Sequence, residues 1–189
     1  MDSSIPFDKS TKIRDDLANF GIFGLYILTR EGLPLVERYY KNLPGQSQKD
    51  GQNTAFGSDS LLVAGFFSAI AKFASEKISG LLSDIGFHTI RLFFDFTEEL
   101  IIILVFDEMK LQMVPFYEVR TICKGTVSQV KQIFETYFGD EKGSEKSHLS
   151  KITHNMADLE RVRENFSKLY PQIDRILHKS FREVKTVLE

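Results

Sequence analysis

Two pairs of apolar stretches, each joined by a short polar turn, are the clearest pattern in the sequence. The first pair begins with "GIFGLYIL", residues 21–28, which is apolar at every position and therefore predicts a central strand covered on both faces. Gly32 supplies a turn, and a second strand is predicted at residues 35–41. Pro34 has no N–H to donate to a β ladder, so this second strand is expected at an edge of the sheet.

The second pair of stretches begins at Phe87. Apolar and polar positions largely alternate through Asp95, "DFTEE" forms the turn, and "LIIILVFDE" follows as a strand buried on both faces. The next stretch, "MKLQMVPFYEV" at residues 109–119, is expected to form a fifth strand whose length Pro115 limits.

Helical spacing predicts a helix on each side of the first hairpin. Residues 10–20 carry apolar side chains three or four positions apart. After a polar stretch at 43–57, expected to be a loop, a long helix begins at Asp59 or Ser60 and ends at Gly80. Its apolar arc is too wide for one sheet, so other helices or a partner are expected to flank it.

The second half of the chain predicts further helices. Residues 125–138 have apolar positions at helical intervals, and a polar linker follows at 139–148. Two amphipathic helices come next, divided by Pro171, because proline breaks the hydrogen-bond ladder of a helix.

The order of these elements predicts an α+β fold. We expect a five-stranded antiparallel sheet with the long helix packed across it and additional C-terminal helices. Residues 1–20 are expected to be an N-terminal extension, 21–139 the folded domain, and 150–189 a C-terminal amphipathic helical segment.

Composition narrows the class of protein. Lys and Arg number 24 against 26 Asp and Glu, a net charge of -2, so no general attraction to nucleic acid is expected. Cys123 is the single cysteine, which excludes an internal disulfide and a multi-cysteine zinc site. The longest apolar run, "LIIILVF", is far shorter than the roughly 20 residues of a membrane helix. The first residues are acidic where a secretory signal would be basic. We expect a cytoplasmic protein that reaches membranes only through partners.

Candidate catalytic groups do not cluster along the chain. Neither G-x-x-x-x-G-K-[ST] nor G-x-G-x-x-G occurs, and "GDEKGSEKS" has the wrong spacing to cradle a phosphate. Cys123 lies near Arg120 and Lys124, which would activate a thiol beside them, but a buried thiol is the favoured alternative. We therefore expect no catalytic residue.

Metal ligands are also sparse. His154 and Asp158 lie one helical turn apart and could share an ion, but two ligands make a weak site, so a solvated helix face is favoured. No metal and no cofactor are expected.

Three stretches resemble the longin and roadblock superfamily: "GLYILTREGLPLVERYY", "SDSLLVAGFFSAIAKF" and "IRLFFDFTEELIIILVFDE". The likeness is to archaeal-type longin proteins related to eukaryotic trafficking machinery, and it covers about residues 20–138. Such domains are non-catalytic scaffolds that bind small GTPases, coat components or each other. The resemblance thus implies an adaptor, not an enzyme, whose partner is a small GTPase or another longin or roadblock subunit, or a second copy of the chain.

The resemblance also implies that the second and third strands are the sheet edges. Roadblock proteins have a helix before the first strand and dimerise through the third-strand edge, whereas longins place helices after the fifth strand; the predicted helix at 126–138 favours longin. In the roadblock mode, the pairing edge would be Phe87 to Asp95. The candidate partner-binding residues are therefore Phe87, Thr89, Arg91, Phe93 and Asp95, together with Tyr39 and Tyr40 of the second strand.

Several alternatives remain open. Arg38 to Lys41 mix basic and aromatic side chains that could stack on bases, although an ordinary edge strand is favoured. A small enzyme or ligand sensor could use a crevice beside the 43–57 loop, and the chain could instead be a self-associating structural subunit. A vesicle-fusion longin would use Arg163 at the centre of a coupling helix, but Pro171 interrupts that helix, so helices folded back on the domain are favoured.

Overall fold

The computed structural model describes residues 7–41, 65–70, 72, 83–97, 100–111, 116–139 and 163–188. In chain order the elements are α1 (Phe7–Phe20), β1 (Ile22–Thr29), β2 (Pro34–Tyr39), β3 (Asp84–Gly86), β4 (Ile90–Phe96), β5 (Leu100–Asp107), α3 (Glu108–Leu111), α4 (Phe116–Gly139) and α7 (Tyr170–Leu188). Residues 65–70, 72 and 163–167 are also helical. The strands form one five-stranded sheet in the order β2-β1-β5-β4-β3, and every neighbouring pair is antiparallel. The predicted α+β fold is confirmed.

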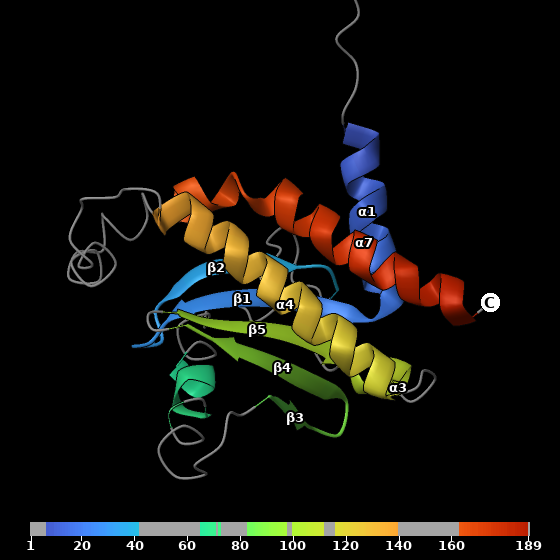
Figure 1. Cartoon of the computed structure of the whole chain (residues 1–189), viewed down its shortest axis with the longest axis horizontal. Coiled ribbons are helices and arrows are strands. Elements are labelled where there is room, and N and C mark those ends of the chain that lie inside the picture. The colour runs from blue at the N-terminus through green and yellow to red at the C-terminus, as the bar shows by residue number, and fades with distance from the viewer. Residues whose placement is uncertain are drawn as a thin grey trace, which may run out of the picture.

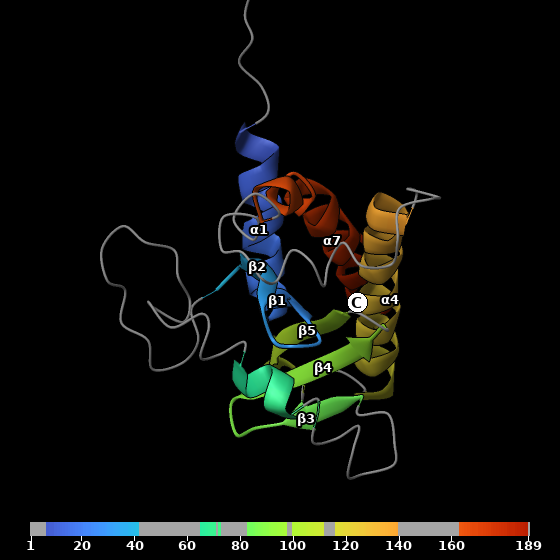
Figure 2. The same cartoon turned by 90° about the vertical axis from the view of Figure 1, so that its left-hand side faces the viewer.

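Helices cover the sheet on both faces. Figure 1 shows α4 and α7 running across one face, with α1 beside α7. In Figure 2 the short helix at 65–72 lies on the opposite side of the sheet from α4. The side chains agree with this arrangement, because Leu17, Val127 and Ile173 share one buried cluster with one side of the strands, and Phe67 belongs to a second cluster on the other side.

The two most apolar strands lie where their sequences predict. All eight residues of β1 are buried, as are the first seven of β5, and the two strands pair with each other inside the sheet. Each strand therefore faces a core on both sides, which explains why neither shows the alternation of a half-exposed strand. β2, which begins at Pro34, lies at an edge as predicted.

Glycines with positive φ end the first helix and form the first turn. Gly21 has a φ of 96°, and its N–H donates to the carbonyl of Ala18 at 3.1 Å, which closes α1. Gly32 has a φ of 89° and donates to the carbonyl of Thr29 at 3.0 Å, as the predicted turn requires.

The predicted fifth strand at 109–119 is wrong. Its described residues are helical, since α3 occupies Glu108–Leu111 and α4 begins at Phe116. The spacing of Val119, Cys123 and Val127, all buried, shows that one helical face runs through this stretch and into the helix predicted at 125–138.

A strand that the sequence did not predict completes the sheet. β3 has only three residues, Asp84–Gly86, and pairs with Arg91 to Phe93 of β4. The stretch predicted as an edge, Phe87 to Asp95, therefore lies mostly in an interior strand with neighbours on both sides, and this placement at the edge is corrected. Three residues are too few to show the alternation by which a strand is recognised.

Gly125 lies inside α4, and this position gives the first test of the structure. A Cβ built on Gly125 would meet no other atom within 4 Å. Gly125→Ala is expected to raise the free energy of unfolding by about 0.5–1 kcal/mol, because alanine loses less backbone freedom in a helix. Chemical denaturation measures this change. If Gly125→Ala instead lowered the free energy of unfolding, α4 would be interrupted at this residue. This is the result expected for a helix that begins at residue 125.

The described part of the C-terminal segment packs on the rest of the fold. Phe166, Leu169, Ile173, Leu177 and Phe181 are buried in the same cluster as the strands. Pro171 lies in the first turn of α7, where a missing N–H costs no helical hydrogen bond, and residues 168 and 169 form a turn before it. The tail is thus divided at residues 168 and 169, just before Pro171, and its described part folds back on the sheet, as favoured over a continuous coupling helix.

Candidate functional site

The two edges of the sheet differ in how they are covered. At the β2 edge, Nε of Arg163 donates to the carbonyl oxygen of Pro34 at 2.8 Å, so the arginine that a coupling helix would have used binds the chain's own edge strand. Farther along β2, Nε of Arg38 donates to Oδ1 of Asp174 at 3.1 Å. The hydroxyl of Tyr40 donates to the same oxygen at 2.6 Å. Side chains from the C-terminal segment therefore bind one backbone carbonyl of β2 and the side chains of Arg38 and Tyr40.

Asp174 is the centre of this contact. It is only 2% exposed, and its carboxylate forms an ion pair with Arg38, whose guanidinium lies over the ring of Tyr170 at 4.8 Å. Burial alone would lower the pKa of Arg38, but the hydrogen bond and the charge of Asp174 raise it, so the guanidinium stays charged. Burial, together with the charge of Asp174, raises the pKa of Tyr40. The cluster is a fully paired polar contact that fixes α7 on β2.

The two candidate partner residues at the end of β2 pack on opposite faces of the sheet, Tyr40 in the cluster with α7 and Tyr39 in the cluster with Tyr26. Tyr40 is held by Asp174. The Tyr39 ring packs edge-on against Tyr26 with centroids 5.6 Å apart, and its hydroxyl donates to Glu37 at 2.8 Å. Burial raises the pKa of Tyr39, and the charge of Glu37 adds to the shift. Both tyrosines therefore have partners within the chain, and their role in binding another molecule stays a prediction.

The β3 edge has a different character. The N–H of Phe94 donates to the carbonyl of Ser83 at 2.9 Å, and the N–H of Phe87 donates to the carbonyl of Ile90 at 2.7 Å. In an antiparallel pair the hydrogen-bonding groups of successive residues point to opposite sides, so those of Asp84 and Gly86 point away from β4. Among the residues that the structure describes, no strand pairs with this outer side of β3.

Arg91, one of the candidate residues, holds the β3 edge together. Its guanidinium donates to Oε2 of Glu108 at 2.8 Å and to Oδ1 of Asp84 at 2.7 Å. The hydrogen bond to Glu108 is the main cause that raises the pKa of Arg91. Arg120 of α4 donates to the hydroxyl of Ser83 at 2.6 Å. These contacts tie β3 to β4, α3 and α4, which gives a three-residue strand a defined position.

The other candidates on this side divide into buried and exposed residues. Phe93 is 1% exposed and lies in the core beneath α4 and α7, so its side chain is not on the surface. Asp95 accepts a hydrogen bond from the N–H of Phe96 at 2.9 Å, which occupies an N–H just beyond the end of β3. Thr89 and Phe87 are exposed, in the turn between β3 and β4.

Phe87 has an exposed aromatic neighbour that the sequence analysis did not single out. Phe66, in the helix at 65–70, is 52% exposed, and Phe87 is 39% exposed. Their ring centroids lie 6.5 Å apart, and we call these two residues the aromatic pair. The apolar arc of the predicted long helix, too wide for one sheet, was the signal that pointed to an exposed apolar residue here.

The described residues hold few groups suited to catalysis. No cluster of three or more His, Cys, Asp or Glu that could hold a metal ion occurs among them. His154 and Asp158, and the 43–57 loop with its possible crevice, lie outside the described residues. In the described part of the chain, no helix has the length and hydropathy to cross a bilayer.

Cys123 gives a direct test of the buried-thiol interpretation. The residue is 0% exposed in α4, and burial raises the pKa of its thiol well above the ordinary value. The folded protein is therefore expected to react with a thiol reagent at pH 8 at least ~100-fold more slowly than the protein unfolded in guanidinium. The absorbance of the coloured thiolate that the reagent releases measures the reaction rate in the folded and in the unfolded state. Rapid reaction in the folded state would show that Arg120 and Lys124 activate this thiol after all.

The strand order and the helices on both faces agree with the fold that the sequence resemblance to the roadblock and longin superfamily implies. Both a helix before β1 and a helix after β5 are present, so the element order does not separate the roadblock from the longin branch. No family model matches the chain, and no curated protein matches it.

Solved structures of MglB are similar to this fold. Myxococcus xanthus MglB is 16% identical with a TM-score of 0.42, over 70% of this chain and 99% of that one. The gliding protein MglB from Thermus thermophilus is 14% identical with a TM-score of 0.34, over 58% and 78% of the two chains. A structure of MglB with a tetrameric arrangement is 14% identical with a TM-score of 0.35, over 60% and 83%.

Proposed function

We propose that this protein is a non-catalytic interaction platform that binds a small GTPase, or another longin or roadblock subunit, through the β3 edge and the aromatic pair. The observation that carries the proposal is the exposure of Phe66 and Phe87 next to each other at the β3 side, whereas the chain's own C-terminal segment binds β2 at the carbonyl of Pro34 and at the side chain of Arg38. Exposed apolar side chains that gather on a surface are typical of interaction sites.

The geometry indicates how the partner would be held. Only Asp84 and Gly86 offer outward backbone groups on β3, and Asp95 already occupies the N–H of Phe96. A partner strand would therefore gain few hydrogen bonds. Burying a fully exposed phenylalanine side chain contributes about 1.5–3 kcal/mol, and Phe66 and Phe87 are still 52% and 39% exposed, so burial of the pair would add a contribution of about this size to that of the β ladder.

The sequence resemblance selects the class of partner. Longin and roadblock domains are scaffolds for small GTPases and for each other, and the strand order of this chain agrees with such a domain. The acidic and basic side chains of the β3 side are paired with one another in the Arg91 network, which favours a role in holding the edge rather than in proton transfer.

The experiment is a calorimetric titration of the full chain with purified small GTPases, each loaded with GDP or with a non-hydrolysable GTP analogue. A complex with at least one GTPase, with different affinities for the two nucleotide states, is expected. Sedimentation of the chain alone at micromolar concentration tests binding to a second copy. A chain that is monomeric and binds none of the GTPases would overturn the proposal.

Substitutions in the aromatic pair separate this surface from the rest. Phe66→Ser and Phe87→Ser are each expected to weaken the complex at least ~10-fold, because aromatic residues at the centre of an interface carry much of its energy. Tyr117→Ser is the matched control, since Tyr117 is 79% exposed on α4 and does not belong to the aromatic pair. Calorimetry with the same partner measures all three. Equal losses in the control would place the interface elsewhere.

A further inference from the structure

We propose that a pocket between α1 and α7 binds a small organic phosphate, that is, a phosphate group carried on an apolar body. The pocket has a volume of about 650 Å³ and is lined by Lys12, Ile13, Asp16, Asn19, Phe20, His178 and Arg182. This volume falls within the range of small-molecule sites in proteins. The pocket is distinct from the β3 edge and from the aromatic pair, so the proposal does not depend on the proposed function.

The two helices bring the lining residues together by their spacing. Lys12, Asp16 and Phe20 follow one another at intervals of four on α1, and His178 and Arg182 do so on α7, so each set lies on one face of its helix. Leu17 and Leu177, both 0% exposed, pack the helices onto the core beneath. The pocket walls therefore belong to elements that the core holds in place.

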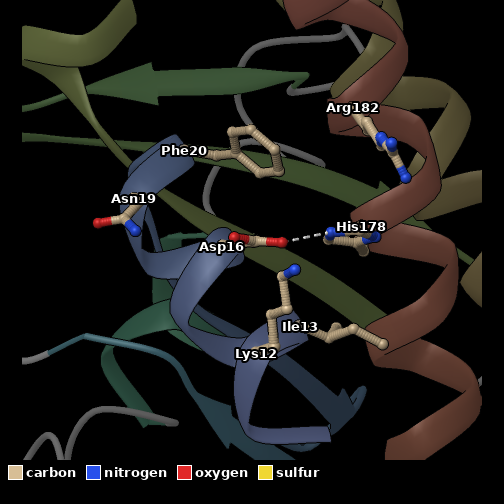
Figure 3. Close-up of a pocket in the computed structure, with 7 residues that line it drawn as sticks. All are labelled: Lys12, Ile13, Asp16, Asn19, Phe20, His178 and Arg182. Carbon is tan, nitrogen blue, oxygen red and sulfur yellow. Dashed lines mark hydrogen bonds and ion pairs between the residues drawn. The ribbon is translucent and has the colours of Figure 1, made fainter. Parts of the chain in front are cut away.

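The polar groups of the pocket converge on one point. Nε2 of His178 lies 2.9 Å from Oδ2 of Asp16, and this pair joins the two helices. Figure 3 shows Lys12 reaching toward the pair from one side and Arg182 extending toward it from the other, whereas Asn19 points away. Among the lining residues in the described part of the chain, Asp16 is the single carboxylate, and the imidazole of His178 already binds it.

The charge of the lining favours an anion. Among the lining residues that the structure describes, two permanent cations, Lys12 and Arg182, stand against one carboxylate, Asp16, so the excess is one positive charge with His178 neutral and two with it protonated. Both cations are on exposed side chains. A phosphate monoester carries up to two negative charges and accepts several hydrogen bonds, which matches this set better than a single carboxylate does.

The apolar wall of the pocket favours an organic body on the phosphate. The ring of Phe20 is half-buried, with its centroid 6.2 Å from His178 and 6.3 Å from Phe181. Ile13 lies on the α1 side of the same pocket. A flat apolar group would be buried between these side chains, and its burial would add to the affinity of the phosphate.

Calorimetric titration of the full chain with phenyl phosphate tests the proposal, with inorganic phosphate as a second probe. Saturable binding of phenyl phosphate is expected, at least ~5-fold tighter than that of inorganic phosphate because of the apolar wall. Lys12→Ala and Arg182→Ala should each weaken the binding at least ~10-fold. Lys179→Ala is the matched control, because Lys179 is an exposed cation of α7 that does not line the pocket.

A vesicle arm separates a lipid headgroup from a soluble ligand. Sedimentation with phosphatidylcholine vesicles, with and without phosphatidic acid, measures binding to a membrane-borne phosphate. Binding only to vesicles with phosphatidic acid, lost in both variants but not in the control, would assign the pocket to a lipid headgroup. Absence of binding to every probe, or binding that neither Lys12→Ala nor Arg182→Ala weakens, would overturn the proposal.

Discussion

Replacing Asp174 with alanine is expected to lower the free energy of unfolding by about 3–5 kcal/mol, because it leaves Arg38 without its counter-charge and the hydroxyl of Tyr40 without its acceptor. The side chains of the ion pair are 3% exposed at Asp174 and 16% exposed at Arg38, so water cannot readily replace the lost carboxylate. Urea denaturation followed by circular dichroism measures the change.

Two further variants make this prediction specific. Asp174→Asn keeps an oxygen acceptor for Tyr40 but loses the charge, and is expected to fall between the wild type and the alanine variant. Asp15→Ala removes an exposed carboxylate of α1 and should change the stability by less than about 0.5 kcal/mol. If Asp174→Ala is as stable as Asp15→Ala, the contact between β2 and α7 does not hold the C-terminal segment in place.

The second large effect concerns Phe93, a candidate partner residue that the structure places in the core. Phe93→Ala is expected to cost about 3–5 kcal/mol of stability, because Phe93 is 1% exposed and its removal leaves a cavity between the sheet and the helices. Phe87→Ala should change stability by only about 0.5 kcal/mol, since its side chain is already exposed.

Denaturation of the two variants side by side tests this division. Both phenylalanines came from the same predicted edge strand, so the comparison asks directly which of them is buried against the helices. Equal and small effects would contradict the burial of Phe93 beneath α4 and α7 and return its side chain to the surface.

The parts of the fold that the sequence predicts are those whose signal is local and long. β1 and β5 are uninterrupted apolar runs, and Gly32 and Pro34 mark the first turn and the edge strand within a few residues. Pro171 likewise marks the division of the tail. In each case, the residues that carry the signal lie within the element or turn that they predict.

The wrong predictions, of a fifth strand at 109–119 and of β4 as an edge strand, also have physical causes. The predicted helix began at Gly125, yet a glycine in the exposed middle of α4 costs only about 1 kcal/mol, less than the burial of Val119 and Cys123 gains. The apolar residues before it then suggested a strand, whose length Pro115 was expected to limit. β3 is too short for any period to appear, so β4 was placed at the edge in its stead.

The sites depend on contacts between distant parts of the chain. Asp174 contacts Arg38 and Tyr40, which lie 136 and 134 positions away in the sequence, and His178 contacts Asp16, which lies 162 positions away. No local sequence pattern can therefore predict either cluster. The only sequence signal for Phe66 was the wide apolar arc of the helix predicted to end at Gly80. Such an arc indicates that other elements cover the helix, but not which of its residues stays exposed.

Amide hydrogen exchange of the full chain, alone and saturated with a small GTPase that it binds, tests the location of the interface most directly. The account predicts added protection at Asp84 to Thr89 and at residues 65–70, with little change in β2 and α7. Protection confined to β2, α1 or α7, with the β3 side unchanged, would contradict it.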